Sequence, residues 1–195
     1  MLNQTTLLFQ LRALAEQQNY QQLKQNCLDN LTENKKPSVL PLLALAQIHL
    51  DEGSAAQESL QQAKQQLDQL ESDAQVDLSA VYLLLHQPKQ ALSILDPLLE
   101  TEPDNAMALA RRGQCHMTMG TNDLALADIE RATELTPERM ALWIQLAQIK
   151  LQKAQYKAAF EAVQQGQSAL ENRLDSLPEH SINDYQQQFA QLKYH

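Results

Sequence analysis

Residues 106–139 read AMALARRGQCHMTMGTNDLALADIERATELTPER, and this stretch decides the fold because its pattern returns on both sides of it. A shift of 34 residues (79 to 113 to 147) aligns it with residues 72–105 and 140–173. Three columns of like residues then coincide: Ser79, Gly113 and Ala147; Ala91, Ala125 and Ala159; and Leu95, Ile129 and Val163. Such self-similarity predicts a protein built of stacked structural repeats.

The residue types in these columns predict pairs of packed helices. Small residues belong where two helices touch closely, and branched residues fill the core between repeats. Pro103 and Pro137 close two of the three units, as expected where a second helix must stop. A further column holds His86, Gly120 and Ala154. Scarce glycine and abundant Leu, Ala and Gln favour the same all-α interpretation.

This pattern resembles the tetratricopeptide repeat (TPR), whose units are helix–turn–helix pairs. The resemblance implies a right-handed α-solenoid of antiparallel helix pairs, a TPR superhelix. It is carried by small residues such as Gly113 and Ala147, and by Ala125 and Ala159 early in the second helices. We expect an array over residues 1–174, with three clear units and two degenerate ones: 5–36, 39–71, 72–105, 106–139 and 140–173.

The first two units match the repeat pattern less well. In the second unit, Leu42 and Ala46 fit a first helix and Ala56 and Leu60 fit a second. Gly53 is expected to mark the inter-helix turn, which would be shorter than in the family pattern.

Residues 175–195 are expected to form a C-terminal capping helix. Leu177-Pro178 breaks the chain, and Ser181 with Asp184 resembles a capping box that begins a new helix. Ile182, Tyr185, Phe189 and Leu192 then recur on one face. Such a helix would cover the apolar end of the stack. The alternative is a helix that binds a partner or folds back into the groove.

Composition narrows the function classes. The 195 residues carry 15 basic and 24 acidic side chains, a net charge of −9, which disfavours nucleic acid and anionic membranes as partners. No apolar stretch is long enough for a transmembrane helix, and the N-terminus lacks a signal-peptide pattern. Cys27 and Cys115 show no metal-binding or disulfide spacing. We therefore expect a soluble cytoplasmic protein, without membrane insertion.

No catalytic or metal-binding motif is found in the sequence. Cys115 and His116 are adjacent, so on a helix their side chains diverge and cannot form a nucleophile–base pair. The acidic pairs Asp51-Glu52 and Asp128-Glu130 are typical of a solvated face. The sequence predicts a protein that is not an enzyme and holds no cofactor or metal.

Function is then expected in the groove that the first helices of TPR units line. Projecting the repeat register gives these inner-face positions: Leu43, Gln47, Leu50, Val76, Ala80, Leu83, Met107, Ala110, Gln114, Met117, Ile144, Gln148 and Leu151. Leu8, Arg12 and Gln152 extend the same set. An apolar surface with interleaved amides suits an extended apolar segment or an amphipathic helix. The alternative is that this face packs against neighbouring helices. It holds if Val76, Leu83, Met117 and Ile144 point into the core.

The charge distribution indicates an acidic shoulder. Between Asp68 and Asp104 the chain has eight acidic residues and a single basic one, Lys89. This run either steers a basic partner or only keeps the protein soluble.

Three functions remain open at this point. The first is a scaffold or adaptor that binds a peptide or helix of a partner protein in the groove. The second is a TPR chaperone, of the secretion type, that holds an apolar segment of a client. The third is a recognition or regulatory module that acts with a separate catalytic domain. Exposed end faces of the stack could also pair two copies of the chain.

Overall fold

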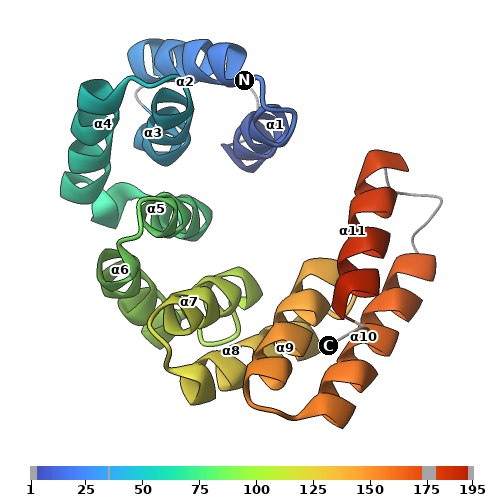
Figure 1. The fold of residues 1–195 in the computed structure, drawn as a ribbon. Coiled ribbons are helices and arrows are strands. Elements are labelled where there is room, and N and C mark those ends of the chain that lie inside the picture. The colour runs from blue at the N-terminus through green and yellow to red at the C-terminus, as the bar shows by residue number, and fades with distance from the viewer. Residues whose placement is uncertain (1–3, 35, 173–178, 193–195) are drawn as a thin grey trace. The chain divides into compact units, whose positions relative to one another are not determined.

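The computed structural model of the chain describes residues 4–34, 36–172 and 179–192, and within these residues the regular secondary structure consists of helices, with no strand (Figure 1). The all-α prediction is confirmed. The helices are α1 Gln4–Glu16, α2 Tyr20–Asn34, α3 Leu40–His49, α4 Gly53–Gln65, α5 Ser72–Leu84, α6 Pro88–Thr101, α7 Ala106–Thr118, α8 Asn122–Leu135, α9 Met140–Gln152, α10 Tyr156–Glu171 and α11 Glu179–Leu192. Two 3₁₀ helices, η1 Pro37–Val39 and η2 Leu67–Gln69, precede α3 and α5.

Each helix pair turns on one residue in the left-handed conformation. The φ angles are 57° at Gln18, 59° at Asp51, 57° at His86, 74° at Gly120 and 56° at Ala154. At Gly120 the backbone N–H donates to the Met117 carbonyl (3.1 Å), and the next N–H, of Thr121, donates to the His116 carbonyl (2.9 Å). The same two bonds recur at the other four turns. Together they form the Schellman motif, which satisfies the last carbonyls of a helix and stops it.

These turns explain one column of the repeat and correct one expectation. His86, Gly120 and Ala154 align because all three hold the left-handed position. Gly53 does not hold it in the second unit, because it is the first residue of α4 and Asp51 makes the turn. Residues 50–52 separate α3 from α4, just as residues 119–121 separate α7 from α8. The expected shortening of this turn was therefore wrong.

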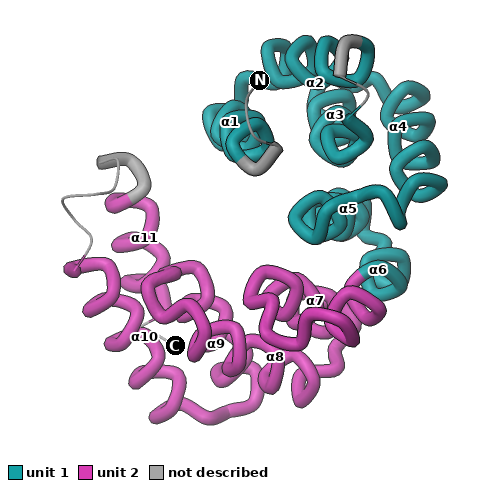
Figure 2. The backbone as a smooth tube through the Cα atoms, turned by 180° about the vertical axis from the view of Figure 1, so that it is seen from behind, with its two compact units in different colours: residues 1–94 teal, residues 95–195 magenta. Residues whose placement is uncertain are grey.

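The chain separates into two compact units, residues 1–94 and residues 95–195 (Figure 2). The repeat pattern gave no sign of this division, which falls inside α6. In unit 1, α3 lies among α1, α2, α4 and α5. Its residues from Leu40 to Ala44, together with Ala46 and Gln47, are all buried. A helix that is apolar around its whole circumference is expected in an interior position.

In unit 2, helices α7 to α10 pack in sequence order, and α11 packs on α9 and α10. The Phe189 side chain of α11 is fully buried. It fits because Gly166 has no side chain: an added Cβ would lie 2.5 Å from Phe189 Cε1 and 2.7 Å from Trp143 Cβ. Helix α11 therefore packs on the last helix pair, α9 and α10.

The start of this helix differs from the expectation. Helix α11 begins at Glu179, two residues before Ser181, so Ser181 is not its N-cap. The expected break at residues 177–178 lies outside the described residues.

The turn geometry predicts opposite effects for two matched substitutions. Gly120→Ala should lower the free energy of unfolding by about 1 kcal/mol, because a Cβ disfavours positive φ. Ala154→Gly, at an exposed residue with the same conformation, should leave stability unchanged or raise it by up to about 1 kcal/mol. Urea denaturation followed by circular dichroism measures both. Equal effects of the same sign would contradict this account of the turns.

Phe189 should anchor the capping helix. Phe189→Ala should cost about 3 kcal/mol, because it empties a fully buried site between α11 and the last pair. Phe160→Ala is the control, since Phe160 lies in the same unit and is 49% exposed. It should change the urea midpoint much less. If the two variants unfolded at the same midpoint, the anchoring role would be refuted.

Candidate functional site

Two of the described histidines, His49 and His116, make contacts within the chain, and both cysteines are buried. The His49 ring stacks on Tyr20 with centroids 4.1 Å apart, and His116 Nδ1 lies 3.0 Å from Thr121 Oγ1. Across the part of the chain that the structure describes, no three His, Cys, Asp or Glu side chains are grouped as metal ligands. Burial raises the pKa of the Cys27 thiol to about 12. Burial also raises the pKa of the Cys115 thiol to about 11, and the opposing effect of the Arg111 charge offsets this only in part.

Both native thiols should therefore be inert in the folded protein. A raised pKa lowers the fraction of thiolate, which is the reactive form. At pH 8 we expect Ellman's reagent to react at least about 100-fold more slowly than with an exposed thiol. Gln10→Cys, at an exposed position on α1, supplies that reference. When the wild-type chain is denatured, both of its thiols should react. Rapid labelling of Cys27 or Cys115 in the folded wild-type chain would contradict their burial.

The predicted inner-face residues fall into three groups. The buried ones are Leu43, Gln47, Val76, Ala110 and Ile144, and Leu8 is buried as well. The half-buried ones are Leu50, Ala80, Leu83, Met107, Gln114, Met117 and Leu151. Gln148 and Gln152 are exposed. Val76 and Ile144 are only 3% and 5% exposed, so the alternative interpretation, packing into the core, describes these two. Leu83 and Met117 keep part of their surface open.

Two polar groups expected to meet a ligand are engaged within the chain. Ser59 Oγ donates to Gln47 Oε1 at 2.7 Å in a buried contact between α4 and α3. The Arg12 guanidinium of α1 donates to both carboxylate oxygens of Asp77 and to Asp73. Burial lowers the pKa of Arg12, but Asp77 and Asp73 more than offset it, so the net shift is upward.

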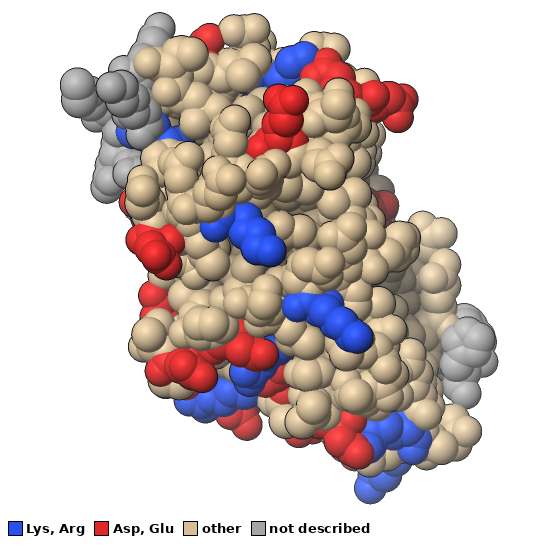
Figure 3. All heavy atoms as spheres, turned by 90° about the vertical axis from the view of Figure 1, so that its left-hand side faces the viewer, with Lys and Arg blue, Asp and Glu red and all other residues tan. Residues whose placement is uncertain are grey.

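Four of the eight acidic residues of the predicted acidic shoulder form ion pairs with arginines of the chain. Besides Asp73 and Asp77, Asp96 pairs with Arg112 at 3.4 Å and Asp104 pairs with Arg131 at 2.7 Å. On the face drawn in Figure 3, Lys and Arg side chains are scattered, several beside Asp or Glu. Half of the acidic run is therefore neutralised by ion pairs within the chain, whereas Asp68, Glu71 and Glu100 are exposed.

One groove in unit 1 was not among the sequence-predicted sites. It is a groove of about 740 Å³ in unit 1, which we call the α4–α6 groove. Its lining comes from the end of α3, one face of α4, the end of α5 and the start of α6. The residues are Ile48, Asp51, Gly53, Ala56, Gln57, Leu60, Gln61, Lys64, Tyr82, Leu85, Gln87 and Gln90.

Helical spacing accounts for the α4 side of this groove. Residues four apart on a helix share a face, so Gly53, Gln57 and Gln61 form one row. Ala56, Leu60 and Lys64 form the row beside it. Gln57 and Gln61 are exposed, whereas Leu60 is buried, so the amides form a rim and the apolar side chains a floor.

The opposite side of the α4–α6 groove repeats this arrangement. Tyr82 and Leu85, at the end of α5, add apolar surface, and Tyr82 is only 8% exposed. Gln87, just before α6, and Gln90, in its first turn, place two exposed amides there. Amide groups both donate and accept hydrogen bonds. The groove can therefore bind apolar side chains in its floor and polar backbone groups at its rim.

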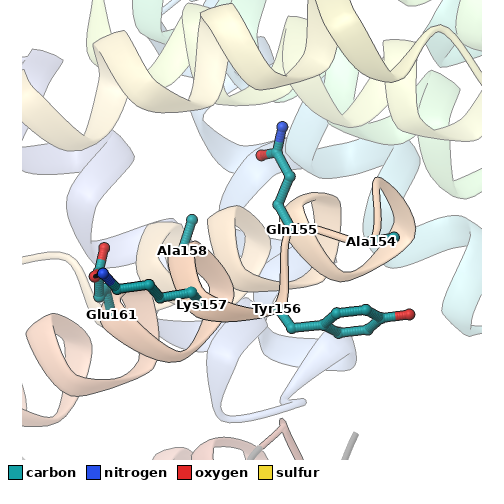
Figure 4. Close-up of a pocket in the computed structure, with 6 residues that line it drawn as sticks. All are labelled: Ala154, Gln155, Tyr156, Lys157, Ala158 and Glu161. Atoms are coloured by element: carbon teal, nitrogen blue, oxygen red, sulfur yellow. Dashed lines mark ion pairs between the residues drawn. The ribbon is translucent and has the colours of Figure 1, made fainter.

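A second hollow, of about 500 Å³, lies at the start of α10 in unit 2. Figure 4 shows Tyr156 pointing away from Lys157 and Glu161, which are paired at 3.9 Å. All its lining residues belong to α10 and the turn before it, Ala154–Glu161. Since a single element lines it, we regard it as a surface hollow and retain the α4–α6 groove as the candidate site.

Comparison with known proteins agrees with the helix-pair architecture. A family model described as ChAPs (Chs5p-Arf1p-binding proteins) matches residues 43–165. The human SGT1 homolog is 31% identical over 85 residues, which cover 44% of this chain and 23% of that protein. The human protein named FK506-binding protein-like is 34% identical over 76 residues, which cover 39% of this chain and 22% of that protein. The chain thus spans about a quarter or less of the length of these relatives.

Solved structures show the same fold. The thermophilic TPR protein TTC0263 of Thermus thermophilus has a TM-score of 0.75 at 20% identity, covering 99% of this chain and 100% of its own. PilW, a type IV pilus biogenesis factor, has a TM-score of 0.70 at 20% identity. The match covers 98% of this chain and 87% of the PilW chain. YrrB, a TPR protein with an unusual peptide-binding site, has a TM-score of 0.56 at 18% identity. The match covers 88% of this chain and 85% of the YrrB chain. The predicted TPR α-solenoid is confirmed.

Proposed function

We propose a protein-binding role for this chain, which belongs to the ChAPs (Chs5p-Arf1p-binding proteins) family. In this proposal the chain is a non-catalytic scaffold that binds a peptide or helix of a partner protein in the α4–α6 groove. The family description names two proteins as binding partners of its members, and YrrB is described by its peptide-binding site. Both descriptions support a polypeptide as the class of ligand.

The observation that carries this proposal is the composition of the groove. An apolar floor that includes Leu60 and Tyr82 lies between two rims of glutamine amides. Peptide-binding grooves combine apolar pockets for side chains with polar groups for the backbone. Asp51 and Lys64 lie at opposite ends of the α4 side, so the groove has no single dominant charge. We therefore infer a ligand segment that is apolar and nearly uncharged.

A second candidate surface lies on unit 2. There the predicted inner-face residues Met107, Gln114 and Met117 of α7 keep part of their surface open, as does Leu151 of α9. Flexible methionines can adapt to different apolar ligands. This surface suits the chaperone alternative, in which an apolar segment of a client is held.

The module alternative is supported by the partial relatives. Each of them matches this chain over less than a quarter of its own length. A segment of this fold is thus found within longer proteins that have further regions.

No described helix is long and apolar enough to cross a membrane. We infer a cytoplasmic location, since both free cysteines suit a reducing compartment.

The groove can be tested with a matched pair of variants on α4. Gln57→Glu/Gln61→Glu puts two carboxylates on the rim, whereas Gln62→Glu/Gln65→Glu changes two exposed glutamines elsewhere on the same helix. Peptides selected on the wild-type chain from a random 12-residue display library serve as probes. We expect the rim variant to weaken their binding about tenfold through lost hydrogen bonds, and the control to change it less than about twofold.

Fluorescence polarisation with labelled peptides measures these affinities. Equal affinity of the selected peptides for all three proteins would refute the α4–α6 groove as the site. If Met117→Glu abolished binding and the rim variant did not, the surface on unit 2 would be the binding site instead.

A further inference from the structure

The ion pairs of Arg12 join two repeats that are not neighbours. Arg12 lies on α1, the first helix of the first pair, whereas Asp73 and Asp77 lie on α5, the first helix of the third. Repeats in a solenoid ordinarily contact only the adjacent repeats. A contact that passes over the second pair is therefore additional to the normal packing of the stack.

The Arg12 guanidinium uses all three of its nitrogens in hydrogen bonds to Asp73 and Asp77. Arg12 Nε and Nη2 donate to Asp77 Oδ1 and Oδ2 at 3.1 and 2.8 Å, as two parallel bonds. Arg12 Nη1 donates to Asp73 Oδ2 at 3.2 Å, and Nη2 donates to the Asp73 backbone carbonyl at 3.0 Å. Such forked pairing is stronger and more directional than a single ionic contact.

Helix α3 lies next to the two helices that Arg12 joins. It packs against both α1 and α5, and its Leu43 side chain is 3% exposed. The Asp77 side chain is 17% exposed, so water and salt screen this pair less than an open surface pair. Lys24 and Glu52 form a comparable pair at 2.5 Å, but between adjacent repeats.

We propose that Arg12 is a clasp that holds α1 to α5 across α3, fixing the curvature of unit 1 and covering its inner surface. The clasp is a conformational device that goes beyond the proposed binding function. When it opens, the α1–α2 pair moves away from α5. Leu43 and Val76, both predicted from sequence to face a ligand, then become accessible.

Distance measurement between two spin labels tests the clasp directly. Nitroxides on Gln10→Cys and Glu71→Cys, both exposed, report the separation of α1 from the start of α5. Cys27 and Cys115 are fully buried, so only the introduced thiols should be labelled. Pulsed electron spin resonance then compares the wild-type background with Arg12→Gln and with Lys24→Gln, the control that removes the adjacent-repeat pair.

Arg12→Gln should lengthen and broaden the distance distribution, and Lys24→Gln should leave it unchanged. About 1 M NaCl should shift the wild-type background in the same direction as Arg12→Gln but by less, because salt screens this half-buried pair only in part. A distribution for Arg12→Gln that matches the wild-type one would overturn the proposal.

Two further arms decide the matter if Arg12→Gln does not fold. Asp73→Asn/Asp77→Asn removes the charges from the α5 side and leaves α1 intact, and it should give the same lengthening. The salt arm needs no change in the clasp residues. Separately, a thiol at Leu43→Cys should react faster when Arg12→Gln is added but not when Lys24→Gln is added. An unchanged rate would show that the inner surface is not covered by the clasp.

Discussion

The architecture depends on one backbone constraint, a residue in the left-handed conformation that ends the first helix of every pair. Gln18, Asp51, His86, Gly120 and Ala154 hold this position, and only one of them is glycine. A left-handed side-chain residue costs roughly 1 kcal/mol of strain. The two hydrogen bonds of the Schellman motif and the packing of the following helix offset that cost at each turn. Because these five turns have the same geometry, five divergent sequences each form a helix–turn–helix unit.

Close packing between the paired helices is the second requirement, and it was predictable from sequence. Ser79, Gly113 and Ala147 are buried where helices meet. At Gly113 an added Cβ would lie 2.7 Å from Ile129 Cδ1, so a larger residue would force the helices apart. Steric requirements of this kind recur in the three clear repeats and therefore appear as columns in the sequence. The capping role of Phe189 was predictable for the same reason, since an apolar face at helical spacing requires a partner.

The functional surface could be predicted only in part, because a helical projection does not say which neighbour covers a face. The projection assigns Leu43 of α3 and Val76 of α5 to a groove, but both side chains are buried. For Leu43 the reason is that α3 is surrounded by other helices. Arg12 was expected to meet a ligand, but its partners lie 61 and 65 residues away. The α4–α6 groove is a space between elements. No single helix carries its signature, and only the placement of α4 beside the end of α5 and the start of α6 shows it.

The central claim, that a partner segment binds in the α4–α6 groove, is tested most directly by a crystal structure of the chain with a library-selected peptide. The account predicts peptide density between Gln57 and Gln61 of α4 on one side and Gln87 and Gln90, at the α5–α6 turn and the start of α6, on the other. Apolar side chains of the peptide should contact Leu60 and Tyr82. Density along α7 and α9, with the α4–α6 groove empty, would contradict it.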